Sequence, residues 1–313
     1  MAMRFPIRFL PDNSKIDFIG KRWVGFAITI ALIALSFFFL ATKGLNLGID
    51  FTGGIMMDVR SESAPDLSKM REALDGKGLG EVSLQNAGDP RNVLIRIQMK
   101  ESADQSKVVE AVKALLKEGG FDKLEYRQID YVGPTVGQEL MRDGFLAMLL
   151  SFAAIMGYLW FRFEWQYGLG GILALVHDGI LTLGFFSVTG FEFGLPSIAA
   201  ILTILGYSIN DSVVIYDRIR ENMRKYKKMP IAELLNLSLN ETLSRTIMTV
   251  MTTLLAVLAL YLFGGEVIHG FSASILFGIV IGTFSSIYIS APVLIYLNIR
   301  PNAEEKAPVG AGA

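Results

Sequence analysis

Long apolar runs separated by short polar loops occupy most of this chain. A helix needs about 20 apolar residues to cross a bilayer, and a run of about 18 is already a candidate. Runs of that length lie at residues 23–42, 144–161, 168–188, 195–216, 246–263 and 271–297. The pattern predicts an α-helical polytopic membrane protein with six transmembrane helices.

The stretch between the first two runs is polar, and its apolar residues recur with the spacings of short strands and amphipathic helices. Its predicted elements are, in order, a strand at 55–60, a helix at 66–74, strands at 81–86 and 92–99, a helix at 104–117 and a strand at 124–131. This βαββαβ order is typical of the α+β ferredoxin-like fold. The stretch has no histidine and its carboxylates are scattered, so we expect a docking or binding module without a catalytic cluster.

The distribution of Lys and Arg predicts the orientation, because cytoplasmic loops are enriched in both. The loops at 189–194 and 264–270 contain neither residue type. The N-terminus and the 217–244 segment are basic, through Arg4, Arg8, Lys15, Lys21 and Arg22 in the first and Arg218, Arg220, Arg224, Lys225, Lys227 and Lys228 in the second. Both termini are therefore expected in the cytoplasm. The first apolar run exceeds the apolar core of a signal peptide, so we interpret it as a retained anchor.

Together these patterns predict the domain boundaries. They are a cytoplasmic N-terminus at 1–22, a first transmembrane helix at 23–42, a periplasmic ferredoxin-like domain at 43–143, a five-helix bundle at 144–297 and a disordered cytoplasmic tail at 298–313. A cytoplasmic helix at 217–245 is expected to connect the fourth and fifth spans. Its alternating charges fit a partner site or a charged collar that fixes topology equally well.

Composition agrees with a chain that is solvated mostly by lipid. Hydrophobic residues make up 52%, charged residues 19%, and the mean hydropathy is +0.44. A net charge of -1 gives no attraction to nucleic acid, and the absence of cysteine excludes disulfides and thiol catalysis. No P-loop pattern occurs, and one His beside one Asp does not make a metal site. We therefore expect neither an enzyme nor a cofactor.

Two charges lie where a bilayer disfavours them. Asp211 is inside the fourth apolar run, and Arg245 is at the entry of the fifth. Either charge costs roughly 2.5 to 3.5 kcal/mol at mid-membrane, so each needs a partner, water or a proton. At 1.5 Å per residue they lie roughly 9 and 6 Å above their polar boundaries, which predicts that they pair across neighbouring helices. The alternative is that Arg245 extends to lipid headgroups and Asp211 caps a polar turn.

A third polar position is the pair His177 and Asp178, near the middle of the third run. A histidine beside a carboxylate is able to titrate near neutral pH and to relay protons. Small residues nearby, Gly179, Thr182 and Gly184, allow close helix packing. A buried, hydrogen-bonded packing node is therefore an equally good interpretation.

Several short motifs occur along the chain in a fixed order. They are GIDFTGG at 48–54, GPTVG at 133–137, VHD at 176–178, LGYSINDSVV at 205–214, DRIREN at 217–222 and SRT at 244–246. No motif is decisive alone, but the ordered set, which covers most of the chain, resembles the SecF side of the SecD/SecF protein-export family. That family is a branch of the resistance-nodulation-division (RND) transporter superfamily.

The resemblance implies a half-transporter of the bacterial inner membrane that pairs with SecD. It implies work beside the SecYEG channel, where the proton motive force promotes late stages of export of a secreted polypeptide. The implied proton-path residues are Asp211, Arg245, Asn210, His177 and Asp178. The implied structural turn after the first span consists of Asp50, Phe51, Gly53 and Gly54. A carboxylate site also accepts sodium, so the coupling ion stays open.

Two other classes of function remain open at this point. The chain is compatible with a stand-alone RND-type exporter of lipids or small molecules, although an outside domain of about a hundred residues is small for a substrate funnel. It is also compatible with a membrane scaffold in which Asp211 and Arg245 serve assembly and not energy coupling. A stand-alone exporter would not retain SecD on purification. In a scaffold, neutralising Asp211 and Arg245 would impair assembly and not energy coupling.

Overall fold

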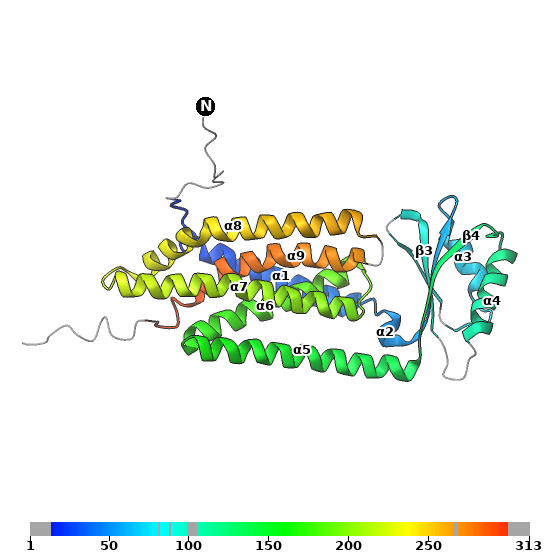
Figure 1. The fold of residues 1–313 in the computed structure, drawn as a ribbon, viewed down its shortest axis with the longest axis horizontal. Coiled ribbons are helices and arrows are strands. Elements are labelled where there is room, and N and C mark those ends of the chain that lie inside the picture. The colour runs from blue at the N-terminus through cyan, green and yellow to red at the C-terminus, as the bar shows by residue number, and fades with distance from the viewer. Residues whose placement is uncertain (1–13, 81, 88, 99–104, 266–267, 300–313) are drawn as a thin grey trace, which may run out of the picture.

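The computed structural model describes residues 14–80, 82–87, 89–98, 105–265 and 268–299. In this part of the chain, long helices form an elongated bundle, and a smaller α+β domain lies at one end of it (Figure 1). The predicted N-terminus through residue 13 and the predicted tail from residue 300 lie outside the described residues.

Within the described residues, six helices are long and apolar enough to cross a membrane. They are α1 (Arg22–Thr42), α5 (Pro134–Arg162), α6 (Trp165–Thr189), α7 (Leu195–Lys225), α8 (Ile231–Phe263) and the helical segment His269–Val293. That last segment consists of α9 (His269–Ser285), a π-helical turn (Ser286–Ser290) and α10 (Ala291–Val293). Each apolar run predicted from the sequence falls within one of these helices or extends a few residues beyond it, so the mostly helical fold is confirmed.

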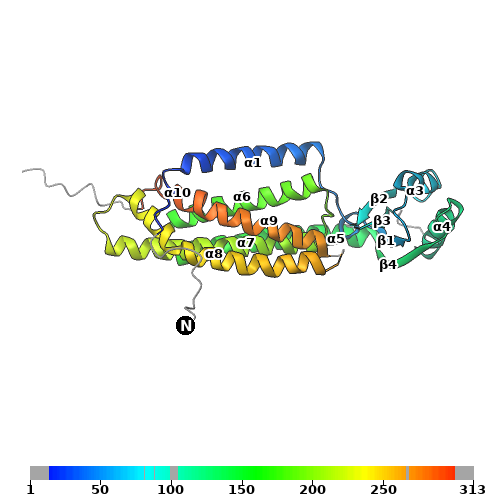
Figure 2. The same ribbon diagram turned by 90° about the horizontal axis from the view of Figure 1, so that it is seen from above.

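Helices α6, α7 and α9 form the interior of the bundle, and α1 packs along α6 (Figure 2). Small residues make these contacts close. A side chain at Gly184 would meet Ser36 of α1, and one at Gly278 would meet Ile204 of α7. The Gly278 and Gly282 pair of α9 therefore faces α7 of the same chain, so these glycines serve internal packing.

The connection between α7 and α8 differs from the single helix expected over 217–245. Helix α7 ends at Lys225 and α8 begins at Ile231, with Pro230 between them. Proline fixes its own φ and disfavours helical geometry at the residue before it, so the chain turns here and restarts. The two helix ends form a hairpin closed by hydrogen bonds from Asn222 Nδ2 to Ser238 Oγ at 3.0 Å and from Arg218 Nε to Glu241 Oε2 at 2.7 Å.

The α+β domain follows α1 and a short helix α2 (Ile49–Thr52). Its elements are β1 (Gly54–Ser61), α3 (Leu67–Leu74), β2 (Val82–Ala87), β3 (Asp89–Ile97), α4 (Gln105–Glu118) and β4 (Leu124–Val132). Among the described residues they form one antiparallel sheet in the order β2-β3-β1-β4. Alternate residues of β1 and β3, such as Met57 and Ile95, are fully buried against α3 and α4. The opposite face of the sheet points toward the bundle.

Candidate functional site

Asp211 is held between α7 and α8 by one hydrogen bond. The hydroxyl of Thr246 on α8 donates to Oδ1 of Asp211 at 2.6 Å. The second carboxylate oxygen, Oδ2, is buried and has no hydrogen-bond partner among the described residues. A buried oxygen without a donor is costly, so the Asp211 carboxylate would be stabilised by a cation, a proton or water.

Arg245 does not meet Asp211 in the way the sequence predicted. It directly precedes Thr246, and consecutive residues of a helix point about 100° apart, so only one of the two faces α7. Arg245 is exposed, and among the described residues no ion pair within 4.0 Å joins it to Asp211. Its exposure fits the alternative in which its side chain extends toward the lipid headgroups. Asn210 is also exposed, on the neighbouring position of α7.

The Asp211 site lies at the periphery of the bundle. Only 6% of the most apolar stretch of α8 is buried within the chain, against 56% for α6. Exposed apolar side chains such as Leu255 and Leu262 continue along α8. This face of the bundle therefore requires lipid or another chain to cover it.

Asp178 of α6 lies in the interior and has contacts on both oxygens. His177 Nδ1 lies 2.9 Å from its Oδ1, and the hydroxyls of Ser208 and Ser285 donate to Oδ2 at 2.5 and 2.9 Å. Asp178 is fully buried and His177 is 2% exposed. The structure thus places the His177 ring against the Asp178 carboxylate and joins Asp178 to α7 and α9. His177 Nε2 is buried without a hydrogen-bond partner among the described residues.

A line of hydroxyl groups continues from Asp178 along the interface between α7 and the last helical segment. Ser212 Oγ lies 2.9 Å from Ser286 Oγ, and Ser290 Oγ donates to the Tyr216 hydroxyl at 2.5 Å. Ser290 and Ser286 belong to the π-helical turn, whose extra residue shifts the register of the following side chains. These uncharged hydroxyls join α7 to the last helical segment.

The GIDFTGG motif forms the junction between α1 and the α+β domain. Asp50 Oδ2 accepts a hydrogen bond from the backbone N–H of Leu195, the first residue of α7, at 2.9 Å. Phe51 is buried against Phe193 with ring centroids 6.0 Å apart. Gly54 has a φ of 124°, and a side chain there would collide with the carbonyl of Ile97. Gly53, at a φ of 69°, packs against Pro134. A side chain at either glycine would therefore clash with the backbone, which explains why both positions are glycine.

A second linkage joins the open face of the sheet to the bundle. Arg96 of β3 donates to Glu192 Oε2 at 2.6 Å and to Asn46 Oδ1 at 2.8 Å. Asn46 Nδ2 in turn donates to the Gly190 carbonyl at 2.8 Å, so the α1–α2 and α6–α7 loops share one network. Arg96 is 8% exposed. A cavity of about 500 Å³ lies beside this network, between the sheet and the loops of the bundle.

The sequence interpretation missed several of these residues. Thr246 belongs to the SRT motif, but the sequence interpretation gave it no role. Its hydroxyl, next to Arg245 at the start of an apolar run, was a signal for a polar contact inside the bundle. Serines 285, 286 and 290 were polar positions inside an apolar run, which marks an interior face. Arg96 and Glu192 lie far apart in the sequence and carry no local signal. Among the described residues, no group of three or more His, Cys, Asp or Glu is placed to hold a metal.

The comparisons with known proteins all point to one family. The model of the SecD/SecF protein-export membrane protein C-terminal family matches residues 111–300, and the SecD/SecF GG motif matches residues 38–65. The protein translocase subunit SecF of Rickettsia akari (strain Hartford) is 54% identical over 93% of this chain and 94% of its own length. That of Rickettsia typhi (strain ATCC VR-144 / Wilmington) is 51% identical over 95% of this chain and 97% of its own.

Solved structures agree with the sequence comparisons. A crystal structure of SecDF, a translocon-associated membrane protein from Thermus thermophilus, has a TM-score of 0.85 at 37% identity and covers 94% of this chain. The super-membrane-facing form of SecDF has a TM-score of 0.69 at 36% identity and covers 97%. This chain spans 40% of the length of the first of those chains and 41% of the second. With both family models matched and relatives similar over nearly their full length, the chain belongs to the SecD/SecF family of protein-export membrane proteins.

Proposed function

We propose that this chain is an accessory subunit of the Sec translocase that uses an ion gradient to promote late stages of protein export. Its relatives are named as protein translocase subunits, which supports the export role. The observation that carries the coupling role is Asp211, whose Oδ1 is bonded to Thr246 and whose buried Oδ2 lacks a donor among the described residues. An intramembrane carboxylate with free acceptor capacity is suited to bind and release a proton or sodium.

A SecD subunit is the proposed partner in this function. The chain spans 40% of the SecDF chain that it resembles, so a separate SecD chain would account for the remainder. The uncovered face of α8, which carries the exposed Arg245, supports a contact beside the ion site. In such a contact Arg245 would act near the interface between halves. The SecYEG channel and the secreted polypeptide are the further partners that we propose.

The proposed topology is a multi-pass protein of the bacterial inner membrane with both termini in the cytoplasm. The basic residues at the hairpin of α7 and α8 support a cytoplasmic location for that end of the bundle. The α+β domain is then periplasmic. Its βαββαβ order and the β2-β3-β1-β4 strand order support a ferredoxin-like fold.

A mechanical route from the ion site to the periplasmic domain follows the length of α7. Asp211 lies in the half of α7 nearest the hairpin, and Asp50 accepts from the first amide at the other end. Arg96 and Glu192 bind the sheet to the loop that precedes α7. One charge crossing 100 mV yields about 2.3 kcal/mol, and one pH unit yields about 1.4 kcal/mol. If ion binding tilts α7, this free energy would shift the equilibrium between two positions of the periplasmic domain.

The test is gradient-dependent export of a secreted substrate from vesicles that contain this chain and SecD. We expect Asp211→Asn to lose the stimulation by the gradient, because Asn keeps the size and the acceptor for Thr246 but holds no ionisable proton. Arg245→Met is expected to lose it as well. Glu233→Gln, which neutralises an exposed carboxylate at the start of α8, is the matched control and should keep full stimulation.

Other outcomes would redirect the proposal. Equal stimulation of wild type and Asp211→Asn would remove Asp211 from the coupling path. Loss of SecD from the purified complex in that variant would favour the scaffold function. A chain that never retains SecD would favour a stand-alone exporter. Exchange of a proton gradient for a sodium gradient identifies the ion. We assign His177 and Asp178 a supporting place in the path, as a node that holds α6 against α7 and α9.

A further inference from the structure

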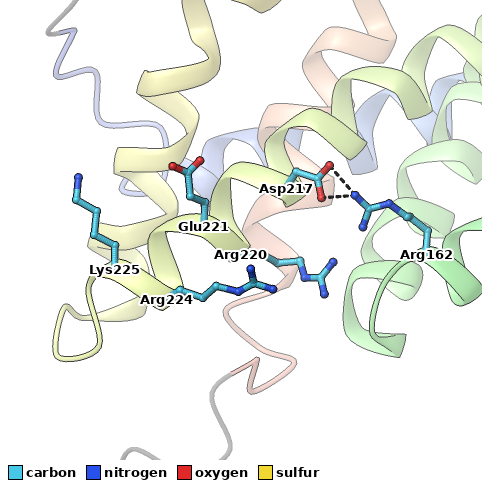
Figure 3. A pocket seen from close by; sticks show the side chains of 6 residues that line it. All are labelled: Arg162, Asp217, Arg220, Glu221, Arg224 and Lys225. Carbon is cyan, nitrogen blue, oxygen red and sulfur yellow. Dashed lines mark hydrogen bonds and ion pairs between the residues drawn. The ribbon is translucent and has the colours of Figure 1, made fainter.

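A basic pocket opens between α5 and α7, at the end of the bundle away from the α+β domain. Its volume is about 560 Å³, and Figure 3 shows the side chains that line it: Arg162, Asp217, Arg220, Glu221, Arg224 and Lys225. Four of these side chains are basic and two are acidic, so the pocket carries a net positive charge. It lies outside the Asp211 site, and only its assignment to the cytoplasmic side rests on the topology proposed above.

The two acidic groups do not neutralise the pocket. Asp217 accepts two hydrogen bonds from Arg162, at 2.8 and 2.9 Å. Glu221 is bound by Arg218 at 2.6 Å, and in Figure 3 its carboxylate lies on the other side of α7 from the arginines.

That leaves two guanidinium groups without a carboxylate partner. Arg220 and Arg224 are one helical turn apart on α7, and both extend toward Arg162 (Figure 3). Among the described residues neither forms an ion pair. Arg220 lies over the ring of Phe163, with 5.6 Å from Cζ to the centroid, which fixes its direction.

The position of the pocket indicates where its ligand comes from. The residues around Arg162 include three aromatic side chains that point out of the bundle: Trp160 is 73% exposed, Phe161 is 93% exposed and Trp165 is 56% exposed. Exposed Trp and Phe beside arginines are typical of a helix end at the boundary between hydrocarbon and headgroups. The pocket mouth is therefore at headgroup depth and adjoins the acyl chains.

We propose that this pocket binds the phosphate of an anionic phospholipid headgroup in the cytoplasmic leaflet. Guanidinium groups bind phosphate oxygens through short charge-assisted hydrogen bonds, and basic pockets between transmembrane helices on this side suit such headgroups. A soluble phosphate would use the same arginines but would gain nothing from the lipid-facing aromatic side chains. The bound lipid would join α5 to α7 near their ends.

The experiment is native mass spectrometry of the full-length chain in mild detergent, titrated with phosphatidylglycerol and, separately, with phosphatidylcholine. We expect phosphatidylglycerol to bind in preference. The double variant Arg220→Gln with Arg224→Gln should weaken that binding about tenfold or more, because two charge-assisted contacts are lost. The matched control, Lys227→Gln with Lys228→Gln, removes the same charge from the adjoining turn and should bind like wild type.

Three results would overturn the proposal. Equal weakening in both double variants would mean general attraction to a basic surface. Equal binding by all three proteins would mean that Arg220 and Arg224 do not contact the headgroup. Displacement of the lipid by glycerol 1-phosphate at equal concentration would assign the pocket to a soluble phosphate. Thermal unfolding in detergent without added lipid verifies that each variant is folded, and these outcomes are independent of ion-coupled export.

Discussion

Asp178 and Asp211 are carboxylates of the same helical bundle with opposite surroundings. Asp178 lies at the centre, fully buried, and both of its oxygens have polar partners on α6, α7 or α9. Asp211 lies at the periphery, and only one of its oxygens has a partner. A saturated network resists change, whereas an oxygen without a donor gains from any cation that reaches it. The comparison separates a carboxylate whose polar contacts join three helices from one that keeps a buried oxygen without a donor.

The contrast also explains why the same residue type was ambiguous in the sequence. Each aspartate interrupts an apolar run, and the cost of a charge in the bilayer is the same for both. The hydroxyls that satisfy Asp178 come from two other helices, at positions 208 and 285. Only the packing of α6, α7 and α9 brings these groups together.

The largest expected effect is on stability, from substitution of Asp178. Asp178→Ala removes three polar contacts and leaves His177 and two serines in an apolar interior, so we expect a loss of about 3 kcal/mol in the free energy of unfolding. Asp211→Ala removes one contact and should cost about 1 kcal/mol. Unfolding of the purified chain in a detergent series measures both. Equal losses would show that the two carboxylates do not differ in the way proposed.

A smaller loss is expected when the donors are removed and the carboxylate is kept. Ser208→Ala with Ser285→Ala deprives Asp178 Oδ2 of both hydroxyls and should cost about 2 kcal/mol. Thr246→Val removes the single donor of Asp211 and should cost about 1 kcal/mol or less, while Thr246→Ser should match wild type. The same unfolding assay applies. A cost for Thr246→Val above that of the serine pair would reverse the comparison.

The end of α7 that adjoins the α+β domain gives a third prediction. Asp50→Ala removes the acceptor for the first amide of α7, and loss of a helix cap costs about 1 kcal/mol. Asp50→Asn retains an acceptor oxygen and should cost less. Hydrogen exchange at the first turn of α7 should rise in the alanine variant and stay unchanged near Asp178. Uniform exchange along α7 would contradict a local cap.

The smallest expected effect concerns a carboxylate in water. Arg91 holds the pKa of Asp89 at about 2, mainly through a hydrogen bond to its carboxylate, against an ordinary value of 3.8. A lowered folded-state pKa stabilises the fold above the ordinary value, and the contribution disappears as the pH falls through about 2. Asp89→Asn should therefore unfold more easily than wild type at pH 5, and the difference should shrink as the pH is lowered toward 2 and vanish below it. Because the pair is exposed, the difference is small.

Arg91→Gln is the control for that prediction. Without the guanidinium, the Asp89 titration followed by NMR of labelled carboxyl carbons should move back toward 3.8. A midpoint that stays near 2 would assign the shift to another group. The outcome sharpens the contrast with Asp178, which is fully buried.

Elements of the fold with a local signal were predictable. The six apolar runs and the periods of β1 and α4 each stand in one stretch of sequence, because a bilayer imposes length and a half-buried element imposes period. Whether Arg245 or Thr246 contacts Asp211 was not predictable, since helix rotation decides which of two adjacent residues faces a neighbour. The predicted boundaries of the connecting helix, 217–245, ran across Pro230, where the structure has a turn. Proline was the usable signal there.

By itself the sequence determined that this chain is a membrane protein with six apolar helices and one polar domain, and its ordered motifs indicated the family. Hydrophobicity is a property of each residue, so apolar runs can be recognised without the tertiary structure. Only the tertiary structure decided that Thr246 faces Asp211, that two serines saturate Asp178 and that Arg96 reaches Glu192. Hydrogen bonds need a donor and an acceptor within about 3 Å, and that distance is set by packing between segments far apart in sequence.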